Sequence, residues 1–206
     1  YAKANEEAIR IYEQIVRKEN IDCDFEKKPS YLYSVDDMRT EELHREAEAA
    51  KNLGIIASYV GGDKITELPF EVKGAVRFEN QAQFHPLKFI KHLVAQLTIY
   101  ENTKVLSVKE HMVYTNTGTI WAENIVFACH YPIINVPGFY FLRQHQERSY
   151  VLALETGKEL SGMYYSIDED GLSFRSVGDV LLLGGGSHRT GKCICHCSDV
   201  NKEKYG

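Results

Sequence analysis

The chain has 206 residues, of which 44% are hydrophobic and 26% are charged, and this composition excludes an intrinsically disordered protein. A formal net charge of −5 argues against a nucleic-acid-binding surface, where Lys and Arg would cluster in excess. No apolar run is as long as a membrane span and no signal-peptide pattern opens the chain, so we expect a cytoplasmic protein.

The first half of the chain is predicted to alternate helices with short strands. Residues 1–20 place apolar side chains three and four positions apart, which is typical of an amphipathic helix. A second helix is expected to begin after a cap region at Ser34 and to end at Gly54. Pro86 marks the first turn of a third helix over residues 85–97. Strands are expected over residues 31–35, 55–60 and 67–80.

The second half is predicted to be mostly antiparallel. Residues 103–122 alternate apolar and polar side chains around turns, which indicates a β-meander, and an apolar strand is expected over residues 125–128. Residues 168–171 are expected to form a hairpin turn. Four further strands are expected, over residues 148–155, 162–168, 171–177 and 179–186. The order of elements predicts an α+β fold with a mixed or antiparallel sheet.

The segment IVFACHYPII runs from an expected strand into Cys129 and His130. A catalytic Cys-His pair needs hydrogen-bond contact, but adjacent side chains of a strand point to opposite faces. A strand end that contacts a ligand is favoured, because ligands of α/β folds gather at such ends. A core strand capped by a turn is the alternative.

Two other motifs give weak signals. Cys193, Cys195 and Cys197 alternate, whereas structural zinc sites usually draw two ligand pairs from separate places, so a tail with free thiols is favoured over a metal site. The glycines of GGGSHRTGK match neither common phosphate-binding fingerprint, and a turn at a strand end explains them equally well.

Arg175 lies in an aromatic-rich stretch. Strand alternation places it on one face with Ser173 and Val177, and places Tyr164 on the opposite face from Tyr165. An arginine near tyrosines suits recognition of a carboxylate, because its planar fork binds both oxygens. The alternative is an exposed sheet face with a cross-strand aromatic pair.

The order of three segments is more informative than any single motif. FENQAQFHPLKFIKHLVAQL is followed by TKVLSVKEHMVYTNTGTIWAENIVFACHYPI and then by LSFRSVGDVLLLGGGSHRTGK. This order resembles the FAD-dependent oxidoreductases of the D-amino acid oxidase/glycine oxidase type, over roughly residues 75–192. The resemblance implies FAD-binding positions at Val105, Ala128, Cys129 and His130. It also implies substrate-binding positions at Arg175, Tyr150 and Tyr164.

The resemblance implies a division of the chain. Residues 80–138 would be part of an FAD-binding domain, and residues 25–79 with 139–192 would form the substrate-binding domain. Residues 1–24 would be a helix linking from a missing FAD-binding N-terminus, and residues 193–206 a tail. The family's strand–GxGxxG–helix unit and its C-terminal flavin-contacting segment are absent, so we expect a central fragment of a larger enzyme.

The parent protein is therefore expected to oxidise the C–N bond of a small amine or amino acid by hydride transfer to FAD, with no catalytic residue from this chain. The fragment itself is expected neither to retain FAD nor to turn over. One alternative is a non-catalytic α+β domain that binds a ligand or protein, and another is a small zinc module at the cysteines. The sequence specifies neither the substrate nor the electron acceptor.

Overall fold

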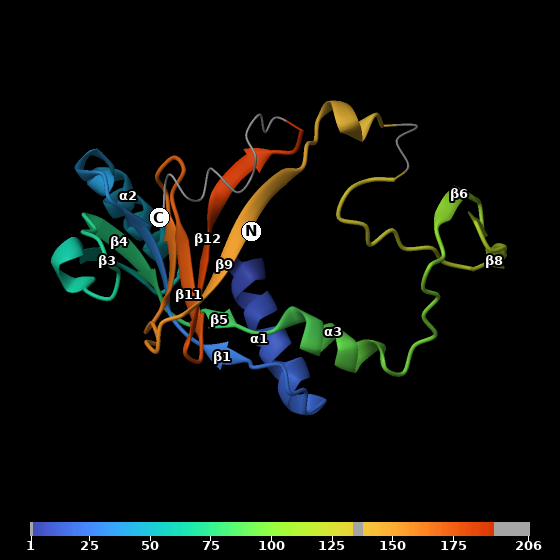
Figure 1. Ribbon diagram of the computed structural model, residues 1–206, viewed down its shortest axis with the longest axis horizontal. Helices are drawn as coiled ribbons and strands as arrows, with labels where there is room; N and C mark the ends of the chain where they lie inside the picture. The colour runs from blue at the N-terminus through green and yellow to red at the C-terminus, as the bar shows by residue number, and fades with distance from the viewer. Residues whose placement is uncertain (1, 134–137, 192–206) are drawn as a thin grey trace.

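A computed structural model describes residues 2–133 and 138–191, and its main feature is a seven-stranded sheet (Figure 1). Neighbouring strands are antiparallel except β2 and β10, which pair in parallel. The predicted α+β fold with a mixed sheet is confirmed. In spatial order the strands are β3 (Ala57–Gly61), β4 (Gly74–Phe78), β2 (Ser30–Ser34), β10 (Met163–Ser166), β11 (Ser173–Val177), β12 (Val180–Arg189) and β9 (Glu147–Glu155).

Helix α2 (Thr40–Asn52) packs against one face of this sheet at the β3–β4 end (Figure 1). Its buried side chains Leu43, Ala47 and Ala50 follow the helical spacing and meet Ala57 and Val76 of the sheet. The predicted end at Gly54 is confirmed, since this residue has a φ of 82° and the Ile55 N–H donates to the Ala50 carbonyl at 3.0 Å.

The predicted start of this second helix was wrong. Ser34 is the last residue of β2, and the cap belongs to Asp36, whose side chain accepts from the Met38 N–H at 2.9 Å. That cap begins a 3₁₀ turn, η1 (Asp37–Arg39), which leads into α2. Several polar residues in a row each match a cap pattern, and only the backbone decides among them.

A second hydrophobic core lies between helices outside the large sheet. Helix α1 (Ala2–Lys18) and helix α3 (Pro86–Val94) pack around Ile21, Cys23 and Phe89, beside the two-stranded pair of β1 (Glu26–Lys27) and β5 (Ala82–Gln83). His85 caps α3 by accepting from the Lys88 N–H at 3.4 Å, and Pro86 occupies the first helical position as predicted. No helix of the described residues is long and apolar enough to cross a membrane.

The predicted meander is confirmed as β6 (Val105–Lys109), β7 (Met112–Thr115) and β8 (Thr119–Trp121), which lie apart from the large sheet (Figure 1). The strand predicted over residues 125–128 was wrong, because the segment is irregular and mostly exposed. Val126 is 86% exposed and Phe127 is 49% exposed. No strand among the described residues pairs with this segment. Apolar composition favours a strand, but a strand also needs a neighbouring strand to accept and donate its backbone hydrogen bonds.

The two faces of the large sheet are covered unequally. On one face, Tyr33, Tyr164 and Phe174 are buried under a loop that contributes Ile65, Leu68 and Val72 and includes the turn η2 (Gly62–Lys64). On the other face, α2 covers only the β3–β4–β2 part. On that same face Tyr165 and Val151 are each 65% exposed, so the β9–β12 part stays open. A third short turn, η3 (Tyr140–Leu142), precedes β9.

Candidate functional site

The open face of β9–β12 carries two adjacent rows of side chains that are fixed by strand register. Residues paired directly across neighbouring strands point to the same face. The first row consists of Tyr165, Ser173, Gly184 and Val151. The second row consists of Arg175, Leu182 and Ala153.

Residues of both rows, together with Ser30 and Met163, line a hollow of about 310 Å³, which we call the Arg175 hollow. Small residues form its floor, because Gly184 has no side chain and its strand neighbour is Ser173. A Cβ atom at Gly184 would lie 2.5 Å from the Ser173 hydroxyl oxygen, so the glycine keeps the floor low. The volume of the Arg175 hollow lies at the small end of the range for ligand sites, which suits a small molecule.

Arg175 lies beside this hollow and is half-buried. Its guanidinium forms no ion pair or hydrogen bond with any other residue that the structure describes. A partly buried guanidinium usually has an anionic partner, because removing a charge from water is costly. The planar fork matches a carboxylate through two parallel N–H donors. The site is therefore suited to a small carboxylate.

A second hollow of about 660 Å³ lies on the other side of Arg175, against β1, β5 and the start of α3. Its wall includes Phe84, His85 and the buried side chain of Gln83. The Gln83 amide is fixed by donating to Glu26 Oε2 at 2.7 Å and to the Ser176 carbonyl at 2.8 Å. Arg175 thus separates an apolar, roomy space from the smaller hollow on the sheet.

The side chains of the other two predicted substrate residues lie on the opposite face from Arg175, although Tyr164 also contributes to the lining of the Arg175 hollow. Tyr164 is on the opposite face, where its ring stacks on Tyr31 at a centroid distance of 4.7 Å. Burial, together with the nearby Glu67 carboxylate, raises the pKa of Tyr164 well above its ordinary value, so the phenol remains a protonated donor. Tyr150 also lies on that opposite face, with its ring 5.7 Å from His188. Their binding roles stay predictions.

Tyr165 and Gly184 lie beside Arg175, although neither was chosen from the sequence. Tyr165 pairs with Ser173, two residues before Arg175 on β11. The hairpin turn at residues 168–171 fixes this pairing, so the turn and the strand alternation together could have predicted that Tyr165 lies near Arg175. Gly184 belongs to a glycine run whose role depends on its neighbours across the ladder, which the sequence does not show.

The predicted cofactor positions lie outside the large sheet. Val105 begins β6 and is 36% exposed, while Ala128, Cys129 and His130 lie in the exposed segment after β8. In the described ranges, none of these positions lies at a glycine-rich turn before a helix that could hold the FAD phosphates. These residues by themselves fit only part of an FAD site, and their roles remain predictions.

The sequence does not decide whether the three C-terminal cysteines bind a metal ion. Cys193, Cys195 and Cys197 lie outside the described residues, as does the rest of the predicted tail. Within residues 2–133 and 138–191, no three His, Cys, Asp or Glu side chains are arranged to hold a metal ion. Of the remaining cysteines, Cys23 is buried and Cys129 is exposed.

A family model described as "FAD dependent oxidoreductase" (DAO) matches residues 1–201. The chain is 34% identical over 206 residues to the "Putative Rieske 2Fe-2S iron-sulfur protein YhfW" of Bacillus subtilis (strain 168), covering 93% of this chain and 40% of that protein. Among solved structures, it is similar to glycine oxidase from Bacillus cereus ATCC 14579, with a TM-score of 0.77, 15% identity, and coverage of 98% of this chain and 60% of that chain.

Another similar structure is L-proline dehydrogenase from P. horikoshii, with a TM-score of 0.65, 13% identity, and coverage of 92% of this chain and 56% of that chain. At such identities the likeness shows a shared fold. The chain spans 40% of the Bacillus subtilis relative and 60% of the Bacillus cereus oxidase.

Proposed function

Because this chain belongs to the DAO family of FAD-dependent oxidoreductases, we propose that its protein oxidises the C–N bond of an amine or amino acid that carries a carboxylate. The observation that carries the proposal is the half-buried, unpaired guanidinium of Arg175 beside the Arg175 hollow. Similar solved structures include an oxidase and a dehydrogenase named for amino acids, which supports a substrate of this class.

The substrate ammonium first loses a proton to solvent, the C–H bond next to the neutral nitrogen then breaks, and a protonated imine with a C=N bond is left; FAD would supply the acceptor for the hydride when it is bound. Water then hydrolyses the imine to a carbonyl compound and ammonia or an amine. The residues described here bind and orient the substrate. Arg175 holds the carboxylate, and the Tyr165 and Val151 side chains border the bound substrate. No acid or base from these residues is required.

The test uses the protein expressed from its complete gene. Under anaerobic conditions, loss of the oxidised flavin absorbance is followed with a panel of amino acids and with the matching amines that lack the carboxylate. Amino acids are expected to reduce the flavin at lower concentrations than their amines. A protein that purifies without flavin, or whose flavin no amino acid or amine reduces, contradicts the proposal.

Arg175→Met isolates the carboxylate contact. We expect kcat/KM for amino acids to fall about 100-fold, because hydrogen bonds to a charged group contribute about 1.5–3 kcal/mol and about 1.4 kcal/mol is a factor of ten. Activity on the amines should change little. Arg175→Lys should recover only part of the loss, since an ammonium lacks the planar fork. Arg45→Met, an exposed position on α2, is the matched control.

We also propose that residues 25–79 and 139–192 form the substrate-binding domain, and residues 80–138 part of the FAD-binding domain. The seven-stranded sheet supports the first assignment, because it takes all its strands from those two ranges. Val105, Ala128, Cys129 and His130 are proposed to border the cofactor from the second unit. Loss of flavin from Val105→Asp protein that remains folded would support that placement, and full retention would contradict it.

A further inference from the structure

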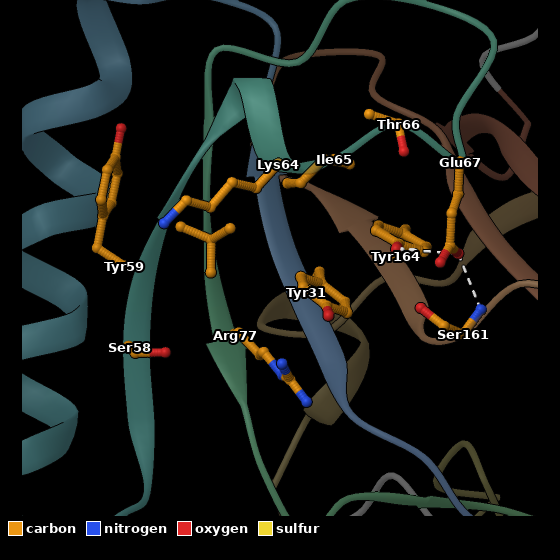
Figure 2. Close-up of a pocket in the computed structure, with 11 residues that line it drawn as sticks. Tyr31, Ser58, Tyr59, Lys64, Ile65, Thr66, Glu67, Arg77, Ser161 and Tyr164 are labelled. Carbon is orange, nitrogen blue, oxygen red and sulfur yellow. Dashed lines mark hydrogen bonds between the residues drawn. The ribbon is translucent and has the colours of Figure 1, made fainter.

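A polar pocket of about 370 Å³ lies on the opposite face of the sheet from Arg175. Figure 2 shows the residues that line it. It is formed between the turn η2 with the residues that follow it and the strands β3, β4, β2 and β10. Its placement follows from register, because Tyr164 pairs with Phe174 and therefore points away from the face that carries Arg175. The pocket and the Arg175 hollow therefore lie on opposite faces of the sheet, and Tyr164 contributes to the lining of both.

The floor of the polar pocket is a fixed row of side chains. Strand pairing places Tyr31 between Arg77 on β4 and Tyr164 on β10. The Arg77 guanidinium lies 5.8 Å from the centroid of the Tyr31 ring, and that ring stacks on Tyr164 at 4.7 Å with an interplanar angle of 11°. Both faces of Tyr31 are therefore occupied, and no planar ring of a ligand can stack on it. Nucleotide bases and other flat aromatic ligands are disfavoured for this reason.

Charges of opposite sign line different sides of the polar pocket (Figure 2). Glu67 Oε2 accepts from the Ser161 N–H at 2.8 Å and from the Tyr164 hydroxyl at 3.2 Å, which fixes the carboxylate and leaves Oε1 acceptor capacity for a further donor. Lys64 forms no ion pair with any described residue. Arg77 pairs with Glu79, with Nε 2.9 Å from Oε1 and Nη2 donating to Oε2 at 3.4 Å, and its Nη1 donors remain for a further acceptor.

These charges restrict the chemistry of an occupant. A simple anion would suffer repulsion from Glu67, and a simple cation would suffer repulsion from Lys64 and Arg77. An apolar molecule would leave the Ser58, Thr66 and Ser161 groups without their water. A molecule with a carboxylate at one end and an ammonium at the other satisfies both signs. The volume suits a small one.

We propose that the polar pocket binds a small amino acid as its zwitterion, with the carboxylate at Lys64 and Arg77 and the ammonium at Glu67. The site is independent of the proposed oxidation at Arg175. Its occupant would contact Tyr164, whose neighbour in the chain, Tyr165, borders the Arg175 hollow on the other face.

The test is a titration of the ¹⁵N-labelled protein expressed from its complete gene, with the Ser161 amide as reporter because it donates to Glu67. Glycine, sodium acetate and methylammonium chloride are added at matched ionic strength. Glycine is expected to shift the Ser161 resonance saturably, at a concentration at least about tenfold below that of either half-ligand, since it alone meets both charges. Absence of a saturable shift, or equal half-saturation for acetate and glycine, overturns the proposal.

Variants locate the two ends of the ligand. Glu67→Gln can still accept from the Ser161 N–H through its amide oxygen, and it should remove the preference for glycine over acetate. Lys64→Met should weaken glycine binding, and Arg175→Met should leave it unchanged. If Arg175→Met abolishes the Ser161 shift, the signal comes from the other face and the proposal fails. If the Arg175 variants show no effect on oxidation but glycine still binds here, only the proposed function fails.

Discussion

Asp168 joins the two halves of the large sheet at the β2–β10 pair. Its Oδ1 accepts from the Ser34 hydroxyl at 2.5 Å, and its Oδ2 accepts from the Val35 N–H at 2.9 Å and from the Ser166 hydroxyl at 3.0 Å. Ser34 is fully buried, so its donor depends on a protein acceptor. Asp168→Ala removes all three acceptor contacts without changing the backbone.

The expected loss in the free energy of unfolding is about 3 kcal/mol. Each hydrogen bond to a charged group contributes about 1.5–3 kcal/mol, but the three share one carboxylate and do not add fully. The Ser34 hydroxyl can also turn to the Asp36 carbonyl, 3.3 Å away, which offsets part of the loss. With a urea m-value of about 2 kcal/mol/M, the unfolding midpoint should fall by about 1.5 M.

Urea unfolding followed by circular dichroism measures this loss. Glu169→Ala is the matched control, because Glu169 is the exposed acidic neighbour in the same turn and should change stability by less than about 0.5 kcal/mol. If Asp168→Ala behaves like the control, the carboxylate does not hold the two halves together, and the reasoning from its contacts is wrong.

Three further predictions follow from particular side chains. Gly184→Val should raise the amino-acid KM of the intact protein about tenfold, because the valine side chain fills the Arg175 hollow, and an unchanged KM would exclude the hollow as the binding site. Gly184→Ala should change stability by less than about 1 kcal/mol, because only the rotatable Ser173 hydroxyl lies close to the added Cβ atom. Burial alone would lower the pKa of the Lys28 ammonium, but its hydrogen bonds to Glu159 and Glu26 outweigh burial and raise that pKa. The stability difference between wild type and Lys28→Met should therefore be full at about pH 8 and vanish as pH rises above about 10.5, and urea midpoints that differ equally at about pH 8 and about pH 11.5 would refute this. In a variant with Cys193, Cys195 and Cys197 replaced by serine, a thiol reagent should modify exposed Cys129 rapidly and Cys23 only in denaturant. Cys23 is protected because it is 1% exposed and because burial raises the pKa of its thiol. Rapid modification of both cysteines in the folded protein would contradict this prediction.

Local patterns predicted most elements of the fold. The helical spacing of apolar residues predicted α1, and strand alternation correctly placed Tyr164 and Tyr165 on opposite faces. These patterns work because a periodic side-chain arrangement has only one way to bury its apolar members. Residues 125–128 failed the same test, because apolar composition favours a strand but only a neighbouring strand can supply its hydrogen bonds.

The site was predicted less completely than the fold. Arg175 was identified because its chemistry is distinctive wherever it points. Its neighbours were not, since which face of β10 and β11 stays open depends on where α2 and the loop over Tyr33 pack. Tyr164 therefore belongs to a core and a separate pocket, while Tyr165 lies beside Arg175. Which face stays open depends on tertiary packing, which local sequence patterns do not predict.

The parallel pairing of β2 with β10 also has a consequence during synthesis. The β3–β4–β2 unit is complete once residue 78 has been made, but the partner of its open edge begins at Met163. At about 5–20 residues per second, the ribosome needs on the order of ten seconds to supply that partner. Throughout this interval β2 presents unpaired N–H and C=O groups, which another nascent chain can engage. The rate of translation between residues 78 and 163 should therefore govern how much of the protein reaches its native sheet rather than aggregating.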